Sequence, residues 1–374
     1  MKDFIFTSES VSEGHPDKMA DQISDAILDS FLEQDSKSRV ACETLVAPGL
    51  VVVSGEVNTG CYVDITGVVK GVLSSIGYNH AKKGMDYKSC SVLTTINHQS
   101  PDISQAVGFG DDQGAGDQGI MFGYAVDETD ECMPLSISLS HQLMKELSVL
   151  RKSPDNDFLW PDSKSQVSVK YKDGQVDSVS SVVVSTQHSP DISVEKIREF
   201  IVEELIKKTI PKKWLKGTEY IINPGGRFVV GGPEADTGLT GRKIIVDTYG
   251  GHGSHGGGCF SGKDPSKVDR SGAYIARQIA KSLVAGNIVK KCLVQISYVI
   301  GKKTPVSLCV EDYGTSNLDQ KSLCDLVLKN WSLSPGAVIQ DLDLLKPRYR
   351  KTAVYGHFGR TEKEFTWEKV KSLA

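Results

Sequence analysis

Three residues near the N-terminus have the types and spacing of a phosphate site. His15, Asp17 and Lys18 stand in the segment Ser-Glu-Gly-His-Pro-Asp-Lys, whose proline suits the first turn of a helix. The free N–H groups of a helix N-terminus attract phosphate. There Asp17 could hold a hard cation such as magnesium, and His15 could hydrogen-bond an oxygen that gains charge in a transition state. The alternative is ordinary helix capping, with carboxylates on a solvated face. That second interpretation is the one expected for the acidic residues that follow at four-residue spacing, Asp21, Asp25 and Asp29.

A second group of candidates lies in the glycine-rich segment 250–265. Gly257, Gly262 and Lys263 have the spacing of a phosphate loop, in which backbone N–H groups and one lysine cradle phosphates. The pattern then fails, because Asp264 stands where a Ser or Thr hydroxyl would ligate magnesium and Pro265 follows at once. This is not an ordinary nucleotide-hydrolase loop. The same segment offers His252, His255 and Cys259 to a metal, but three ligands on a flexible loop make a zinc site improbable.

Cations are unusually frequent around this segment. They are Arg227, Arg242, Lys243, Lys263 and Lys267. A solvated basic face is one interpretation. Against it, the cations alternate with glycines and with Asp236 and Asp269, which is the composition that a polyphosphate with bound metal requires. Phe228 is expected to be a core residue, and the hexapeptide 114–119, which places Asp117 among glycines, is weak on its own.

Composition excludes several other classes of protein. The formal net charge is -4, so no global field would attract nucleic acid or anionic lipid. No apolar run approaches the length of a membrane span, and we expect a cytoplasmic protein whose eight cysteines are reduced. The sequence contains neither a Gly-x-Ser-x-Gly elbow nor a His-Glu-x-x-His helix. A metal-assisted polyphosphate site remains.

The elements that would position these residues are mixed. Helical periodicity predicts helices over residues 16–32, 141–152, 194–206 and 268–285, the last ending at Gly286. Branched residues predict strands over 40–57 with a turn at Pro48-Gly49, and over 91–96, 166–171 and 176–186. Hairpins among helices favour an α+β fold over a doubly wound parallel sheet. The length of 374 residues predicts two or three domains, and a repeated Ser-Pro-Asp-Ile at 100–103 and 189–192 is compatible with three.

Several long motifs, taken in order, closely resemble the methionine adenosyltransferase family, also called S-adenosylmethionine synthetase. They are residues 6–18, the hexapeptide 114–119, Gly-Leu-Thr-Gly-Arg-Lys at 238–243, residues 256–270 and Ala-Val-Tyr-Gly-His-Phe-Gly-Arg at 353–360. The resemblance therefore covers nearly the whole chain. It implies that the sulfur of L-methionine attacks C5′ of ATP, and that the expelled triphosphate is hydrolysed to pyrophosphate and phosphate. A thioether has no proton to remove, so the absence of an obvious general base agrees with this reaction.

The resemblance also implies a role for each matching residue. Six residues would take part in catalysis, namely His15, Lys164, Arg242, Lys243, Lys263 and Asp117. ATP would be bound by His15, Asp162, Ser163, Lys164, Arg227, Phe228, Asp236, Arg242, Lys243, Cys259 and Lys263, with Phe228 now stacking on adenine. Methionine would be bound by Glu56, Gln99, Asp236 and Lys267. Asp17 and Asp269 would hold magnesium, two ions per site, and Glu43 potassium.

The family fold implies three similar α+β units around a pseudo-threefold axis. We expect an N-terminal unit over 1–98, a gating loop over 99–110, a central unit over 111–229 and a C-terminal unit over 230–374. The protein would form a homodimer or a dimer of dimers with active sites between subunits. The gate, at residues 107–112, is shorter than in bacterial relatives, and Cys259 replaces the usual alanine, which would make that site oxidisable.

Two other functions are left open by the residues alone. A phosphoryl transferase using residues 257–263 would phosphorylate an acceptor and leave ADP, whereas the adenosyl transfer produces no ADP. A non-catalytic nucleotide-binding or nucleic-acid-binding module would use the cations without chemistry, and the net charge of -4 disfavours it.

Overall fold

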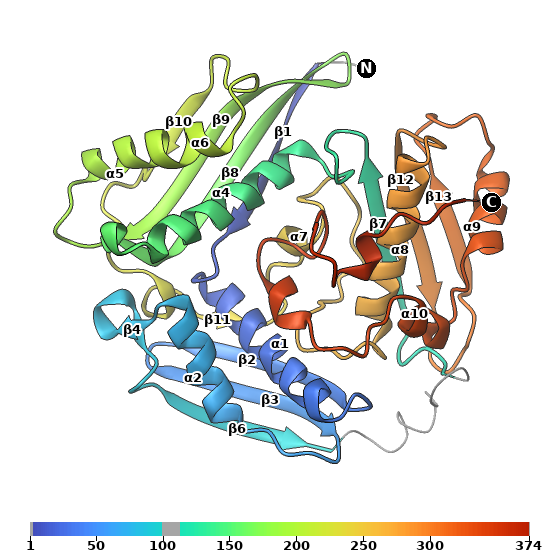
Figure 1. Ribbon diagram of the computed structural model, residues 1–374, viewed down its shortest axis with the longest axis horizontal. Coiled ribbons are helices and arrows are strands. Elements are labelled where there is room, and N and C mark those ends of the chain that lie inside the picture. The colour runs from blue at the N-terminus through green and yellow to red at the C-terminus, as the bar shows by residue number, and fades with distance from the viewer. Residues whose placement is uncertain (1–2, 99–112, 374) are drawn as a thin grey trace.

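Three sheets, each covered by helices on one face, make up most of the protein (Figure 1). The structure is a computed structural model that describes residues 3–98 and 113–373. Gln99 and the expected gating loop lie outside these residues. In the described ranges, no helix is both long and apolar enough to span a bilayer.

The first unit contains α1 (Pro16–Gln34), β2 (Arg39–Ala47), β3 (Leu50–Asn58), α2 (Ile65–Ile76) and β6 (Ser91–Asn97). β2 and β3 form the predicted hairpin, with Gly49 in the left-handed region at φ 65°. Val40, Val46, Val51 and Val53 are fully buried beneath α1 and α2, whereas their strand neighbours point to the other face of the sheet. No helix of the described residues covers that face.

The second unit contains α4 (Leu135–Lys152), β8 (Leu159–Lys172), β9 (Gln175–His188), α5 (Val194–Phe200) and β10 (Glu219–Ile222). The β8–β9 hairpin turns at Asp173 and Gly174, both at positive φ, as the Lys-Asp-Gly sequence predicts. The helix expected over 194–206 is only partly regular, because α5 continues as a π-helical turn (Ile201–Ile206) and ends in α6 (Lys207–Thr209).

The third unit contains α8 (Val268–Ala285), β12 (Lys291–Tyr298), β13 (Ser307–Glu311), α9 (Gln320–Asn330) and α10 (Pro335–Asp341). α8 has the predicted bounds, including its cap at Gly286. The smaller elements are β4 (Asn79–His80), β5 (Met85–Asp86), α7 (Ile244–Asp247) and the 3-10 turns Ala81–Lys83, Pro154–Asn156, Gly232–Glu234, Tyr349–Ala353 and Thr366–Glu368.

One strand of each sheet comes from a different part of the chain. β1 (Phe4–Val11) pairs with β8 of the second unit, and β7 (Gly119–Val126) pairs with β12 of the third. β11 (Gly238–Leu239) pairs with β2 of the first. Each of these strands is followed along the chain by the long helix α1, α4 or α8 and then by an antiparallel hairpin. This exchange ties the units together and brings the segments after β1 and β11 to the same place.

The α+β class is confirmed by this arrangement. The sequence did not reveal α2, α9, β7, β12 or β13, and α4 begins six residues before its predicted start at His141.

Candidate active site

The N-terminus of α1 is placed by a tight contact with the start of β8. A Cβ on Gly14 would lie 2.3 Å from the carbonyl oxygen of Pro161, so only glycine lets the two segments approach this closely. Ser12 N–H donates to the carbonyl of Ser163 at 2.9 Å. The contact sets the first turn of α1 beside the start of β8, which carries Asp162 and Lys164.

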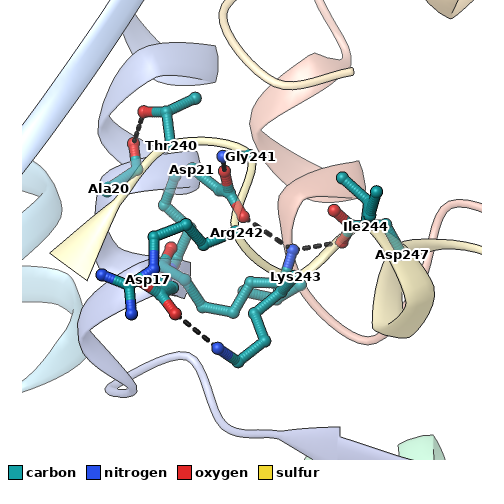
Figure 2. A network of polar contacts seen from close by, with 12 residues as sticks. Asp17, Ala20, Asp21, Thr240, Gly241, Arg242, Lys243, Ile244 and Asp247 are labelled. Atoms are coloured by element: carbon teal, nitrogen blue, oxygen red, sulfur yellow. Dashed lines mark hydrogen bonds and ion pairs between the residues drawn. The ribbon is translucent and has the colours of Figure 1, made fainter. Parts of the chain in front are cut away.

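The turn at residues 238–243 is held against the first turn of α1 by Asp17 (Figure 2). Oδ1 of Asp17 accepts the N–H of Leu239 at 3.0 Å and lies 3.5 Å from Nε of Arg242, while Oδ2 accepts from Nζ of Lys243. Burial would raise the pKa of Asp17, but the hydrogen bonds from Lys243 and from the Leu239 N–H outweigh it and hold that pKa below its usual value. The structure thus brings Asp17 of α1 together with Arg242 and Lys243, residues that the sequence analysis considered separately.

His15 caps α1, and its Nδ1 accepts the N–H of Asp17 at 3.2 Å. Burial, followed by the charges of Lys243 and Lys164, lowers the pKa of His15 to about 3. The imidazole is therefore neutral at neutral pH, and with Nδ1 acting as acceptor its proton resides on Nε2. His15 can thus donate one hydrogen bond to a nearby oxygen without bringing a charge of its own.

The expectation that Asp21 and Asp25 are solvated is wrong, since both are fully buried. Asp21 accepts the N–H of Gly241 at 2.9 Å and pairs with Lys18 at 2.9 Å (Figure 2). Lys18 also contacts Asp247, so this lysine is a buried structural cation that does not face the phosphate site.

The same row of carboxylates continues along α1. Asp25 accepts the N–H of Gly262 at 2.9 Å and pairs through both oxygens with Arg270, at 2.7 and 2.9 Å. Asp29, only partly buried, accepts backbone N–H groups of residues 348, 349 and 350, each at 2.9 Å. We call Asp17, Asp21, Asp25 and Asp29 the acidic row. Because its members lie one helical turn apart, a single helix holds three loops of the third unit in register.

The acidic row makes stability depend on pH in a way that a variant can isolate. Burial raises the pKa of Asp29 to about 6 from 3.8, so its ionisation favours the unfolded chain. The contribution of Asp29 to stability is complete below pH 3.8 and is lost as pH rises to about 6. Asp29→Asn should remove about 1 to 3 kcal/mol of this pH dependence. Urea unfolding of both proteins at pH 4 and pH 7 measures it, and an equal difference at the two pH values would contradict the assignment.

Lys263 and Asp269 form a second cation–carboxylate pair, at 2.6 Å. Asp269 lies in the first turn of α8, where a Cβ on Gly258 would come within 2.2 Å of its Oδ1. A Cβ on Gly119 would lie 3.7 Å from the same atom, so the hexapeptide that contains Asp117 ends beside this pair. Asp117 itself is exposed and accepts its neighbour's N–H, and no hydrogen bond or ion pair joins it to a cation in the described structure.

The segment with phosphate-loop spacing has a different conformation. The N–H of Gly262 donates to Asp25, and its carbonyl accepts the N–H of Cys42. Lys263 forms an isolated antiparallel β-bridge with Ala41. A Cβ on Gly262 would lie 1.9 Å from the carbonyl oxygen of Cys42. These glycines let the loop approach β2, and α8 begins only at Val268. The geometry gives no support to a phosphoryl-transferring phosphate loop.

The histidines and cysteine of this segment face different neighbours. His252 stacks on Phe6 and bonds to Ser136, whereas Nδ1 of His255 accepts the N–H of Gly257. In the described part of the chain, no three His, Cys, Asp or Glu residues are grouped as a metal site. Cys259 packs against Gly241. A Cβ added to Gly241 would lie 2.6 Å from the Cβ of Cys259. Burial raises the pKa of its thiol, which disfavours the oxidation expected there.

Asp162 and Phe228 are two of the residues expected to bind ATP, and their backbone contacts fix where they lie. Oδ2 of Asp162 accepts the N–H of Gly232 at 2.9 Å, and burial raises the pKa of Asp162 to about 6. Phe228 is half-buried outside both apolar cores and is anchored through its backbone to His188, so its ring is not a core residue. Ser163 instead contacts Sδ of Met144 at 3.7 Å beneath the sheet, which directs its hydroxyl away from these two residues.

Three of the residues expected to bind methionine or potassium lie near Cys42 of β2. Burial raises the pKa of this thiol to about 12, and the charges of Glu56, Lys267 and Glu43 all act on it. Glu43 and Glu56 are exposed on the face of the sheet that no helix covers. Lys267 is paired with Asp264, a buried carboxylate that the sequence analysis did not assign. Asp236 and Arg227 are exposed; the charge of Asp236 acts on Asp162, and Arg227 directly precedes Phe228.

The chemistry of these donors suits magnesium better than zinc. Mg²⁺ binds through one or two carboxylates together with waters and substrate phosphates, and does not require a closed protein cage. Asp17 and Asp269 each present one carboxylate beside lysines that would meet the same phosphates. These residues therefore fit a metal shared with a polyphosphate.

Comparison with known proteins agrees with this geometry. Family models for the N-terminal, central and C-terminal domains of S-adenosylmethionine synthetase match residues 3–101, 112–228 and 230–369. The chain is 52% identical to S-adenosylmethionine synthase of Clostridium tetani (strain Massachusetts / E88) over 381 residues, which cover 99% of this chain and 97% of that protein. This chain belongs to the S-adenosylmethionine synthetase family.

Proposed function

We propose that this protein makes S-adenosylmethionine from ATP and L-methionine, with the residues described above as its active site. The methionine sulfur attacks C5′ of ATP, the bond from C5′ to the triphosphate breaks, and the triphosphate is hydrolysed to pyrophosphate and phosphate. The observation that supports the residue assignment is the contact of His15, Asp17 and Lys243 at the N-terminus of α1, with a second pair, Lys263 and Asp269, next to the loop that Asp25 of the same helix holds. Identification of the products formed from ATP and methionine tests the reaction.

Stabilisation of the leaving group is the main task of this site. The attacking thioether is neutral and needs no base, while the departing triphosphate carries the charge. Arg242, Lys243 and Lys263 would bind its oxygens, and His15 would donate Nε2–H to the oxygen released from C5′. Because Arg242 and Lys243 are already held by Asp17, their positions require little reorganisation during the reaction.

The metal assignments extend this proposal. Asp17 and Asp269 would hold magnesium, two ions per site shared with the phosphates, and Glu43 would hold potassium. Magnesium, when bound, would neutralise the charge that develops on the triphosphate. Lys164 and Arg227, both exposed, would add phosphate contacts, and Cys259 would line the nucleotide site beside Gly241.

Methionine would be bound by Glu56, Asp236 and Lys267, and Asp117 would lie near the sulfonium. Glu56 lies opposite Ala41 in the β2–β3 hairpin, and Lys267 pairs with Asp264, which accepts the N–H of Val40, so both lie beside the same stretch of β2. Gln99, the remaining expected ligand, lies outside the described residues, as does the gate.

Adenine would stack on Phe228, with Asp162 and the backbone of Ser163 nearby. Phe228→Ala should raise KM for ATP about tenfold, because stacking on an aromatic ring contributes about 1 to 3 kcal/mol per base. Phe228→Tyr keeps the ring and should bind ATP normally. Steady-state kinetics with methionine at saturation measure both. Equal KM values for the alanine and tyrosine variants would remove Phe228 from the adenine site.

The repeated order of elements supports three units related by a pseudo-threefold axis. Each consists of a lent strand, a long helix, a hairpin and a second helix, as β1-α1-β2-β3-α2, β7-α4-β8-β9-α5 and β11-α8-β12-β13-α9. The expected unit boundaries at residues 98, 110 and 229 divide the sequence into consecutive segments. In space, β1, β7 and β11 each pair with a sheet of a different unit from the one that contains them in the sequence.

We also propose a homodimer or a dimer of dimers, built through the uncovered sheet faces. In the first unit, Leu239, Leu45, Val52 and Leu93 pair in one row across four strands. Leu93 is 57% exposed, although the row is apolar. Glu43 and Glu56 lie on this same face, so its closure by a second subunit would place the active site between subunits. A cytoplasmic location stays a prediction.

A further inference from the structure

A cavity of about 380 Å³ lies outside the active site, between the connection from α1 to β2 and one face of α10. Its lining includes Lys37, Arg39, Gln113, Asp264, Ile339 and Leu345. The volume is within the range of pockets that hold small organic ligands. None of the roles proposed above uses it.

The polar wall of this cavity has a hydrogen-bond donor without a partner. Gln113 is only 3% exposed, and its Oε1 accepts from Nη2 of Arg39 at 3.1 Å. Its Nε2 is shielded from solvent and has no hydrogen-bond partner in the described structure. A buried amide N–H left unpaired is costly, so a ligand with an acceptor oxygen would be favoured here.

Charge on this wall also favours an anion. Asp264, the one carboxylate among the described residues that line the cavity, already accepts from the N–H of Val40 at 2.7 Å and of Ser266 at 2.9 Å, and pairs with Lys267. Nη1 of Arg39 lies 3.6 Å from Oδ1 of Asp264. Arg39 and Lys267 therefore pair with this carboxylate, and Lys37 is a further cation in the lining of the cavity.

The opposite wall is formed by α10 and is mostly apolar, with Gln340 as its one polar side chain among the described lining residues. Gly336 and Ile339 lie three residues apart on one face of α10, and Leu345 follows the helix. A ligand that spans the cavity would place an acceptor group at Gln113 and an apolar body against Ile339 and Leu345.

We propose that this cavity binds a small amphipathic carboxylate, with its oxygens on the Gln113 amide and the Arg39 guanidinium and its apolar part on α10. Occupancy would draw Arg39 away from Asp264, which would then hold Lys267 more tightly. If Lys267 binds methionine, the ligand raises KM for methionine and leaves kcat unchanged. This second consequence rests on the proposed function, whereas the binding does not.

Binding is tested with 2-naphthoate as the probe, in an NMR titration of the purified protein without substrates. Wild-type protein should bind naphthoate saturably and 2-naphthalenemethanol, its uncharged counterpart, much more weakly. Ile339→Trp fills the cavity and should weaken naphthoate at least about tenfold, and Gln113→Leu removes the donor and should weaken it about fivefold. Leu328→Trp, on the exposed side of α9, is the matched control and should bind as wild type does.

Absence of saturable binding, equal affinity for the alcohol, or unchanged affinity in Gln113→Leu would overturn the site. The coupling is read separately, from KM for methionine with and without naphthoate. A rise in wild type that is absent in Gln113→Leu supports the coupling, and an unchanged KM at saturating naphthoate contradicts it.

Discussion

Replacement of Asp17 with asparagine is expected to lower kcat for S-adenosylmethionine formation by about 10³. The amide oxygen can still accept the Leu239 N–H, but the amide carries no charge for Lys243 or Arg242 and cannot offset the desolvation of a bound cation. Replacing one carboxylate oxygen with an amide nitrogen therefore removes both the charge that positions the two cations and the charge that binds the metal. Initial rates at saturating ATP, methionine and magnesium give the measurement.

Asp35→Asn is the matched control for this change, because Asp35 caps the opposite end of the same helix. It should leave kcat unchanged. Unfolding of the Asp17 variant in urea separates misfolding from a catalytic defect. A folded Asp17→Asn enzyme with kcat within about threefold of wild type would show that Asp17 neither holds the cations in place nor binds metal.

Lys263→Met should lower kcat by about 10² to 10³, the effect of removing one preorganised donor from a developing anion. Lys263 pairs with Asp269 at 2.6 Å and would exchange that carboxylate for the triphosphate when substrate binds. The loss should appear in kcat more than in KM for ATP, since the contact strengthens as charge leaves C5′. Lys263→Arg keeps the charge and should retain part of the activity.

Lys346→Met, which removes an exposed lysine paired with Asp343, controls for the loss of one positive charge. It should behave as wild type. If Lys263→Met raised only KM for ATP, Lys263 would be a ground-state contact and the assigned transition-state role would be wrong.

Local patterns predicted the start of α1, the β2–β3 and β8–β9 hairpins and the bounds of α8, because capping residues, turn glycines and apolar periodicity act over a few positions. The exchange of β1, β7 and β11 between sheets could not be predicted from local sequence patterns. It pairs Leu239 with Leu45, nearly two hundred positions apart, and no local pattern encodes that pairing.

The acidic row shows the same limit at the site itself. Acids every four residues along a helix are typical of a solvated face, and the sequence did not distinguish that case from burial of Asp21 and Asp25 against loops of the third unit. The apolar stripe at Met19, Ile23 and Ile27 lies on the opposite side of the helix from these acids, which is the pattern of an amphipathic surface helix, so no local signal indicated their burial. Asp247 gave no signal, since it acts through Lys18, which only the tertiary structure brings to it. Asp264 pairs with a lysine three positions away, and the sequence analysis considered it only as a departure from the phosphate-loop pattern.

The central claim is tested most directly by the products of one reaction. Purified protein is incubated with ATP, L-methionine, magnesium and potassium, and the products are identified by mass and quantified. The account predicts S-adenosylmethionine, pyrophosphate and phosphate in equal amounts, with no ADP and no reaction when methionine is omitted. Methionine-dependent formation of ADP without the sulfonium product would contradict it.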